Sequence, residues 1–178
     1  NGEVDLSLNG VYSADEVIGS ALAARAGVPA QWATPVQVRV NNVNHASSTQ
    51  GMFGSYSYVE VEDQTFVTSH FPTDDNGNYY RGVDGVNHNA SLQYSTDITS
   101  YETLYPKENN KEANDYTDLI NLTKALDATQ TPDASFAAAV NGKIDVKEWR
   151  RYFAFNVLVG NGETALATRP ADDDGLYR

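Results

Sequence analysis

Apolar residues return every three or four positions near the start of the chain, which predicts a helix over residues 14–26. Ser13 and, three residues later, Glu16 have the spacing of a capping box, in which each side chain covers an unpaired backbone N–H. Gly27 suits the left-handed residue that ends many helices, and Pro29 cannot continue one. The apolar positions of this helix are Val17, Ile18, Ala21, Leu22 and Ala26.

Two stretches after this helix alternate between apolar and polar residues, as half-buried strands do, and span residues 35–40 and 53–62. The polar link between them is long for a hairpin but is compatible with antiparallel pairing. Residues 74–78 read Asp-Asp-Asn-Gly-Asn, which is a turn composition, and a short strand is expected over residues 79–82. The first half of the chain is therefore predicted to combine one helix with mainly antiparallel strands.

The last third of the chain has apolar spacing typical of helices. The expected helices are residues 115–128, capped by Asn114 or Asp115, residues 132–140 and residues 145–159. Residues 85–114 are polar and aromatic with weak periodicity, and we expect them to be mostly loop. Strands in the first half followed by helices in the second predict the α+β fold class.

The helix expected over residues 145–159 differs from the others because its apolar residues lie nearly all round it. Asp145 and Glu148 have a cap-like spacing at its start. A helix that is apolar on most sides belongs in the middle of a core. We therefore expect low exposure for Trp149, Phe153 and Val157.

Composition limits the functions that the chain can have. It has 178 residues, 40% of them hydrophobic, which is enough to form a real core and excludes a disordered tail. Its formal net charge is -12 and it has no evident basic patch, so we expect no binding to nucleic acid. It has no cysteine, which excludes disulfides, zinc–thiolate sites and a thiol nucleophile. No apolar run is long enough to span a membrane.

Familiar catalytic motifs are absent from the sequence. The three histidines, His45, His70 and His88, do not have the spacing of zinc ligands. Residues 74–78 and 172–175 are each rich in oxygen ligands like a calcium loop, but neither has the full pattern. Turn chemistry explains the first of these stretches better, and a solvated acidic loop is the default explanation for the second.

Four stretches, in the correct order, carry a resemblance to the CotH-type family, a secreted kinase-like family named for a bacterial spore-coat protein. They are AARAGVPA followed by VQVRVNN, then GSYSYVEVEDQTFVTSHF, then GNYYRG, and last DVKEWRRYFAFNVLVGNGETAL followed by DDDGLYR. The chain resembles the N-terminal and middle part of such a domain. The last stretch is the most specific, because the family has an aromatic-rich helix, an Asn-X-Asp motif and an aromatic strand there.

The resemblance implies an atypical protein-kinase-like fold that uses ATP and Mg²⁺ or Mn²⁺ to phosphorylate secreted proteins. It implies that Glu163, at the Asp position of the Asn-X-Asp motif, is catalytic and binds metal, and that Glu60 contacts the nucleotide. The expected metal ligands are Glu163, Asp172, Asp173 and Asp174, with Ca²⁺ as an alternative cation. The family has a later metal-binding Trp-Asp-X-Asp motif, so we expect residues 1–178 to be one domain that is incomplete at its C-terminal end.

Each of these residues also has a purely structural interpretation. Glu60 can be a solvated strand residue beside Glu62. Asn161 and the glycine after it can form a helix C-cap that Glu163 simply follows. Asn156 either satisfies its hydrogen bonds inside the core or shapes a site, and the first is more common.

Two functional hypotheses from different classes therefore stay open. In the first, the chain is part of a secreted bacterial kinase that modifies a secreted or surface protein. In the second, it is a non-catalytic structural or binding domain of an extracellular or surface assembly. Glu163 in place of Asp, and Gly175 in place of an aromatic residue, favour the second hypothesis. The start at Asn1 suggests an excised or processed piece of a longer protein.

Overall fold

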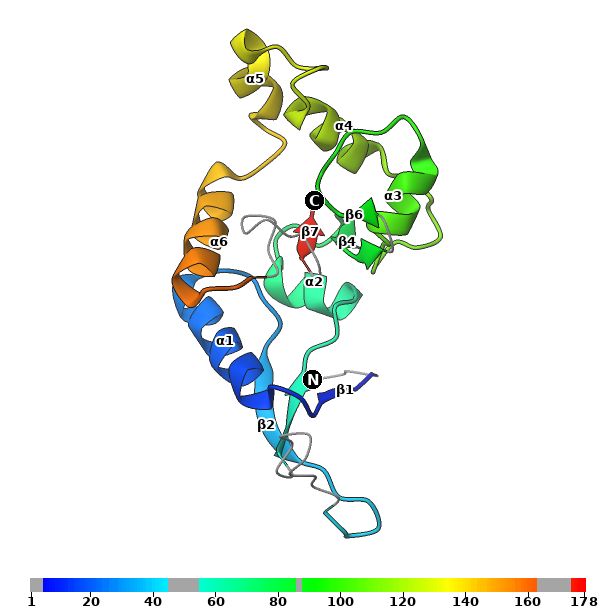
Figure 1. The fold of residues 1–178 in the computed structure, drawn as a ribbon. Helices are drawn as coiled ribbons and strands as arrows, with labels where there is room; N and C mark the ends of the chain where they lie inside the picture. Colours follow the sequence, from blue (N-terminus) through cyan, green and yellow to red (C-terminus); the bar gives the residue numbers. More distant parts are fainter. Residues whose placement is uncertain (1–4, 45–54, 86–87, 163–173) are drawn as a thin grey trace. The chain divides into compact units, whose positions relative to one another are not determined.

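The computed structural model describes residues 5–44, 55–85, 88–162 and 174–178 of the chain (Figure 1). The chain packs as two compact units, which we call unit 1 (Asn1–Thr73) and unit 2 (Asp74–Arg178). Helices and antiparallel strands together confirm the α+β class. The expectation of a single domain over residues 1–178 stays a prediction, because compactness alone does not define a family domain.

Unit 1 is built on an antiparallel sheet with the strand order β1-β3-β2. Its strands are β1 (Ser7–Asn9), β2 (Ala33–Gln37) and β3 (Ser55–Val59), and its helices are α1 (Ser13–Ala26) and α2 (Gln64–His70). The central strand β3 pairs Tyr58 with Leu8 on one side and with Thr34 on the other. Helix α1 packs on β2 and β3, which encloses the small core of this unit.

Strand β2 begins two residues earlier than expected and stops at Gln37. The valine that we placed at its end, Val40, instead pairs with Val43 across a tight turn. Asn41 and Asn42 in this turn have φ angles of 50° and 63°, the left-handed geometry of a two-residue hairpin loop. The predicted strand over residues 35–40 is therefore confirmed only as far as Gln37, and Val40 belongs to the turn around Asn41 and Asn42.

The start of α1 differs from the predicted capping box. The N-cap is Tyr12, and Ser13 is already the first helical residue. Glu16 does not cap the helix, because its carboxylate accepts hydrogen bonds from the side chains of Asn9 and Ser57. The other end is confirmed, since Gly27 is the C-cap with a φ of 71°.

The described residues of unit 2 form two small antiparallel sheets and four helices. The strands are β4 (Tyr79–Arg81), which pairs with β7 (Gly175–Tyr177), and β5 (Asp84–Gly85), which pairs with β6 (His88–Asn89). The helices are α3 (Ile98–Leu104), α4 (Thr117–Leu126), α5 (Asp133–Val140) and α6 (Val146–Val159). Strand β4 and the three helices after residue 114 confirm the predicted elements to within about two residues, the usual uncertainty of helix ends. None of the described helices is both long and apolar enough to cross a membrane.

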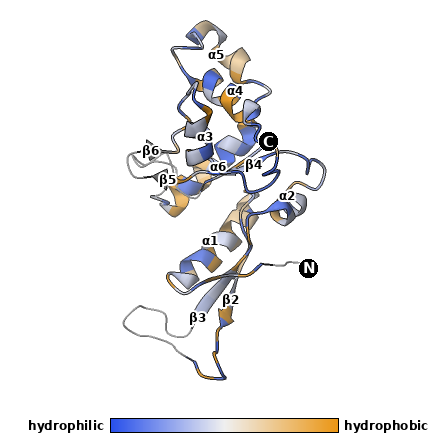
Figure 2. Ribbon diagram, turned by 90° about the vertical axis from the view of Figure 1, so that its right-hand side faces the viewer, coloured by the Kyte–Doolittle hydropathy of each residue, from blue (hydrophilic) through white to orange (hydrophobic). Residues whose placement is uncertain are grey.

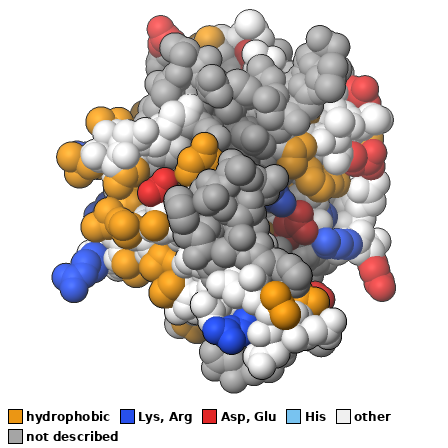
Figure 3. All heavy atoms as spheres, turned by 60° about the horizontal axis from the view of Figure 1, so that its bottom comes forward, with side chains coloured by type: hydrophobic (Ala, Val, Ile, Leu, Met, Phe, Trp, Pro, Cys, Tyr) orange, Lys and Arg blue, Asp and Glu red, His pale blue; other side chains and the backbone are white. Residues whose placement is uncertain are grey.

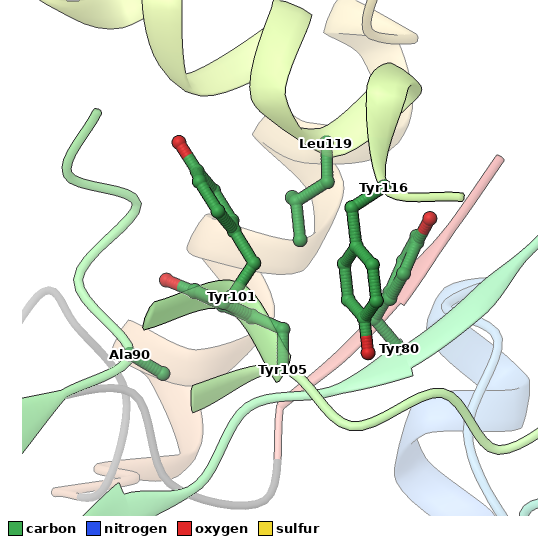
Figure 4. Close-up of a cluster of buried hydrophobic side chains, with 6 residues drawn as sticks. All are labelled: Tyr80, Ala90, Tyr101, Tyr105, Tyr116 and Leu119. Carbon is green, nitrogen blue, oxygen red and sulfur yellow. The ribbon is translucent and has the colours of Figure 1, made fainter. Parts of the chain in front are cut away.

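The core of unit 2 consists mainly of tyrosines (Figure 4). Its buried members are Tyr80, Ala90, Tyr101, Tyr105, Tyr116 and Leu119. The hydroxyls also find partners: that of Tyr101 lies 2.6 Å from the Thr123 hydroxyl, and that of Tyr105 accepts from the backbone N–H of Leu92 at 2.6 Å. These pairings allow a polar group to be buried with each ring.

Residues 85–114, which we expected to be mostly loop, supply part of this core. They contain α3, whose N-cap Asp97 accepts a hydrogen bond from the backbone N–H of Thr99 at 3.0 Å. Tyr101 and Tyr105, one helical turn apart, are both buried. The expectation was wrong at α3 because the buried residues of this segment are tyrosines, whose hydroxyl groups obscure the apolar periodicity.

Burial raises the pKa of Tyr105 from 10.0 to about 12. The folded state therefore favours the neutral phenol, and this stabilisation is complete below pH 10 and is lost as the pH rises through about 12. We expect the free energy of unfolding in urea to fall over this range. In Tyr105→Phe the free energy of unfolding should fall less steeply with pH. The two slopes should differ by about 1 kcal/mol per pH unit, which is the effect of one proton. Equal slopes in the two proteins would contradict this assignment.

Helix α6 lies where it was predicted, but its burial was predicted wrongly. Asp145 caps it as expected, accepting from the backbone N–H of Lys147 at 2.8 Å and of Glu148 at 3.1 Å. Its only buried residue is Asn156, and Val157 is 69% exposed. Figure 2 shows the hydropathy of the residues along the ribbon. The rings of Trp149, Tyr152 and Phe153 are grouped along the helix instead: Phe153 lies 5.8 Å from Trp149 and 5.6 Å from Tyr152, and both Trp149 and Phe153 are half-buried.

Candidate functional site

Glu60 directly follows β3 and is the first candidate residue that the structure describes. Its side chain is 2% exposed. The carboxylate oxygen Oε2 accepts a hydrogen bond from the backbone N–H of Trp32 at 3.2 Å and lies 2.9 Å from Nε2 of His70. The backbone carbonyl of Glu60 accepts from the side-chain amide of Gln31 at 2.7 Å. Glu60 is therefore not a solvated strand residue, and the structural alternative of that form is wrong.

His70 reaches Glu60 from the last turn of α2, a helix that we did not predict. Asp63 caps the start of α2, because its Oδ1 accepts from the backbone N–H of Thr65 at 2.6 Å and of Phe66 at 3.2 Å. The ring of Phe66 stacks on that of His70 with centroids 4.2 Å apart. The sequence did contain a signal for this helix, because Asp63 is a typical N-cap residue and is followed by the apolar residues Phe66 and Val67. Both apolar residues are buried in the structure.

This arrangement holds the Glu60 side chain in one position. Both hydrogen bonds of the carboxylate end on Oε2, and none of the described residues donates to Oε1. A buried carboxylate needs partners to be stable, and His70 and the Trp32 N–H provide them. The Glu60 carboxylate can therefore serve as a rigid hydrogen-bond acceptor for a ligand, or it can have only the structural role of binding His70. Its role in nucleotide binding stays a prediction.

Asp174, the predicted metal ligand that the structure describes, directly precedes β7. Its Oδ1 accepts a hydrogen bond from the hydroxyl of Tyr152 on α6. Its backbone carbonyl accepts from the backbone N–H of Gly82 at 2.8 Å. Burial, together with the bond to Asp174, raises the pKa of Tyr152, so this phenol is neutral and remains a donor to the carboxylate.

Asn161, from the Asn-X-Asp-like motif, is held by the same helix. Its side-chain amide donates to Oδ1 of Asn156 at 3.0 Å, and its backbone N–H donates to the carbonyl of Asn156 at 3.0 Å. Asn156 is 4% exposed and also donates to the carbonyl of Tyr152 at 3.1 Å. The C-cap of α6 is Gly160, with a φ of 68°, so Asn161 lies one residue beyond the cap.

Tyr152 and Asn156 lie four residues apart, which places them on one face of α6. Tyr152 binds Asp174, which follows residues 163–173, and Asn156 binds Asn161, which precedes them. Glu163, Asp172 and Asp173 themselves lie outside the described residues. Sequence reasoning considered Asn156 but missed Tyr152, although a polar pair at helical spacing in an apolar helix was a signal for both.

The described residues include no group of three or more His, Asp or Glu side chains that could hold a metal ion. Figure 3 draws one face of the molecule with the described Lys and Arg side chains in blue and the Asp and Glu side chains in red. Gly175, which replaces an aromatic residue of the family, has a local explanation. A Cβ atom at this position would overlap the hydroxyl of Tyr79, whose ring is buried, so glycine is required in β7.

Comparison with protein families gives one match, a family described as CotH kinase protein, over residues 16–173. Neither curated proteins nor solved structures gave a match. The matched range begins within α1 and continues through β2, β3 and the described helices after them to Asp173. Because the match covers most of the sequence, the chain belongs to the CotH kinase family.

Proposed function

We propose that this chain is part of a kinase module that uses ATP and a divalent cation to phosphorylate secreted or surface proteins. Family membership supports the kinase class. The single observation that carries the proposal in the structure is that Tyr152 and Asn156 on one face of α6 bind the residues on both sides of residues 163–173. In this proposal the module acts outside the cell or at its surface.

Anchoring both sides of the segment to one helix favours a return of the chain that brings Glu163 toward Asp172, Asp173 and Asp174. Carboxylates that gather without a cation repel one another, so their convergence favours bound metal. Carboxylate oxygens are the ligands that Mg²⁺ and Mn²⁺ prefer, which fits Mg²⁺ or Mn²⁺ better than zinc. When bound, the cation would offset the charge of the nucleotide phosphates, while Tyr152 holds the Asp174 carboxylate in place.

Glu60 is proposed to contact the nucleotide through its free acceptor oxygen. The support is its rigid setting: the carboxylate is buried and fixed by Trp32 and His70. Catalysis of phosphoryl transfer rests on positioning and electrostatics, so a preorganised acceptor suits this role.

A second candidate function is a non-catalytic domain in an extracellular assembly. One observation favours it: Asp174 and Glu60, the two candidate site residues that the structure describes, both make structural hydrogen bonds inside the protein. Glu163 in place of Asp is the corresponding argument from the sequence.

The test is calorimetric titration of ATP with Mg²⁺, Mn²⁺ or Ca²⁺ into the full parent protein, followed by transfer of labelled phosphate to a secreted protein. In Glu163→Gln we expect transfer to fall roughly a hundredfold, because the variant removes the negative charge proposed to hold the cation. Glu108→Gln is the matched control, because Glu108 forms only an exposed pair with Lys111. If the folded parent protein binds no nucleotide, the kinase proposal is wrong, and the non-catalytic assembly domain is then the better hypothesis.

Tyr152→Phe tests the anchoring separately from the chemistry. This variant keeps the ring contact with Phe153 and removes only the hydroxyl that donates to Asp174. We expect the affinity for Mn²⁺ in the presence of ATP to fall roughly 10- to 100-fold, as is usual when a group that orients a metal ligand is lost. Unchanged affinity in a stable variant would show that Asp174 needs no such support.

A further inference from the structure

Lys107 is a buried cation whose surroundings are unusual. It is 7% exposed, and its ammonium group lies 5.8 Å from the ring centre of Tyr80 and 5.7 Å from that of Tyr116. These are the two neighbouring rings of the tyrosine core shown in Figure 4, with centroids 5.4 Å apart. Aromatic faces attract a cation and offset part of the cost of its burial.

The ammonium has more donors than the protein uses. A lysine carries three N–H donors, and the described residues provide one hydrogen-bond acceptor, the carbonyl of Ala113 at 2.9 Å. No carboxylate of the described residues lies within the 4.0 Å of an ion pair with Lys107. A buried charge that has no carboxylate in direct contact is costly, and this favours binding of an anion from solution.

Lys107 also lies at a place that a ligand can reach. It lines an open depression with a volume of about 530 Å³, together with Asn78, Asn110, Lys111, Glu112, Ala113 and Asp115. Every lining residue belongs to unit 2. None of the lining residues is one of the candidate kinase residues.

The charges around the depression restrict which anion can bind. The hydrogen bond from Thr117 lowers the pKa of Asp115, and Lys107 adds to this, so Asp115 is negative at neutral pH. Glu112 adds a second carboxylate to the lining, while Lys111 is paired with Glu108 at 3.0 Å. A dianion such as phosphate would be repelled by these carboxylates, whereas a single carboxylate meets less repulsion.

We propose that Lys107 is the anchor of a binding site for the carboxylate group of a small ligand. The two unused N–H donors of the ammonium face a carboxylate oxygen, and the rings of Tyr80 and Tyr116 hold the ammonium in place. Charge-assisted hydrogen bonds of this kind are about twice as strong as neutral ones. The site is independent of the proposed phosphoryl transfer and needs neither ATP nor metal.

A matched pair of probes tests the proposal on the whole chain. N-acetylglycine carries one carboxylate, and N-acetylglycinamide has the same body without the charge. We expect N-acetylglycine to give saturable NMR shifts at the ring protons of Tyr80 and Tyr116 and at the amides of residues 107–115, at constant ionic strength. The neutral amide and inorganic phosphate at pH 8 should give shifts that are at least roughly tenfold weaker at equal concentration, in keeping with loss of a charge-assisted bond.

Lys107→Met keeps the aliphatic stem and removes the charge, and it should weaken binding of N-acetylglycine roughly tenfold or more. Lys107→Arg should keep binding, and Lys124→Met should leave it unchanged within about twofold, since Lys124 is exposed on α4 and does not line the depression. Equal binding of the charged and neutral probes by the unmodified chain would overturn the proposal, whatever the variants do. So would the absence of any saturable shift, or equal binding by a folded Lys107→Met.

Discussion

Glu60→Ala is expected to lower the stability of unit 1 by about 3 kcal/mol, because it leaves donors without their buried acceptor and opens a cavity. The change removes the acceptor for the Trp32 N–H at 3.2 Å and for His70 Nε2 at 2.9 Å. It also leaves a cavity, because the Glu60 side chain is 2% exposed. The effect is large because the carboxylate is shared by the end of β3 and the end of α2.

Hydrogen exchange is the appropriate measurement, since two compact units need not unfold together. Protection of the amides in β3 and α2 should fall in Glu60→Ala, while that of α4 in unit 2 should change little. Glu60→Gln is the matched control, because it keeps the volume and one acceptor oxygen and should cost less than half as much. Equal protection in the alanine variant and the unmodified chain would mean that the pair with His70 contributes no stability.

Gly77→Ala is expected to destabilise unit 2 by about 3 kcal/mol, at the upper end of what overpacking costs. A Cβ atom at Gly77 would overlap the backbone carbonyl of Arg178 and approach the ring of Tyr177 to 2.8 Å. The obstacle is backbone, which cannot rotate away as a flexible side chain can. Asn78 and Arg178 exchange backbone hydrogen bonds at this point, so the pairing at the end of β4 and β7 would be lost.

The control for this variant is Gly19→Ala, which should change stability in the opposite direction. Gly19 lies within α1, and a Cβ atom there has no other atom within 4 Å. Alanine in a helix interior is favoured over glycine by about 1 kcal/mol. Urea unfolding and hydrogen exchange of β4 measure both effects. A Gly77→Ala variant that is as stable as the unmodified chain would show that the two strand ends separate easily.

The candidate site was only partly predictable, and the reason differs from residue to residue. Glu60 was found through a resemblance at β3, but its burial depends on His70, ten residues later, in a helix without a strong apolar pattern. Tyr152 was missed because its partner, Asp174, lies 22 residues away and in another element. A hydrogen bond between distant segments leaves no periodic mark in a sequence.

Local patterns by themselves determined the α+β class, the starts and ends of most helices and the position of β4. Such features depend on interactions within a few residues, as at Gly27, which ends α1, and Asp145, which caps α6. Only the tertiary structure decided that Glu16 binds Asn9 and Ser57 rather than capping its helix, and that Val157 is exposed. In the same way it decided that four tyrosines form the core of unit 2. The physical reason is that burial and side-chain pairing depend on which surfaces meet, and this is set by contacts between residues far apart in the chain.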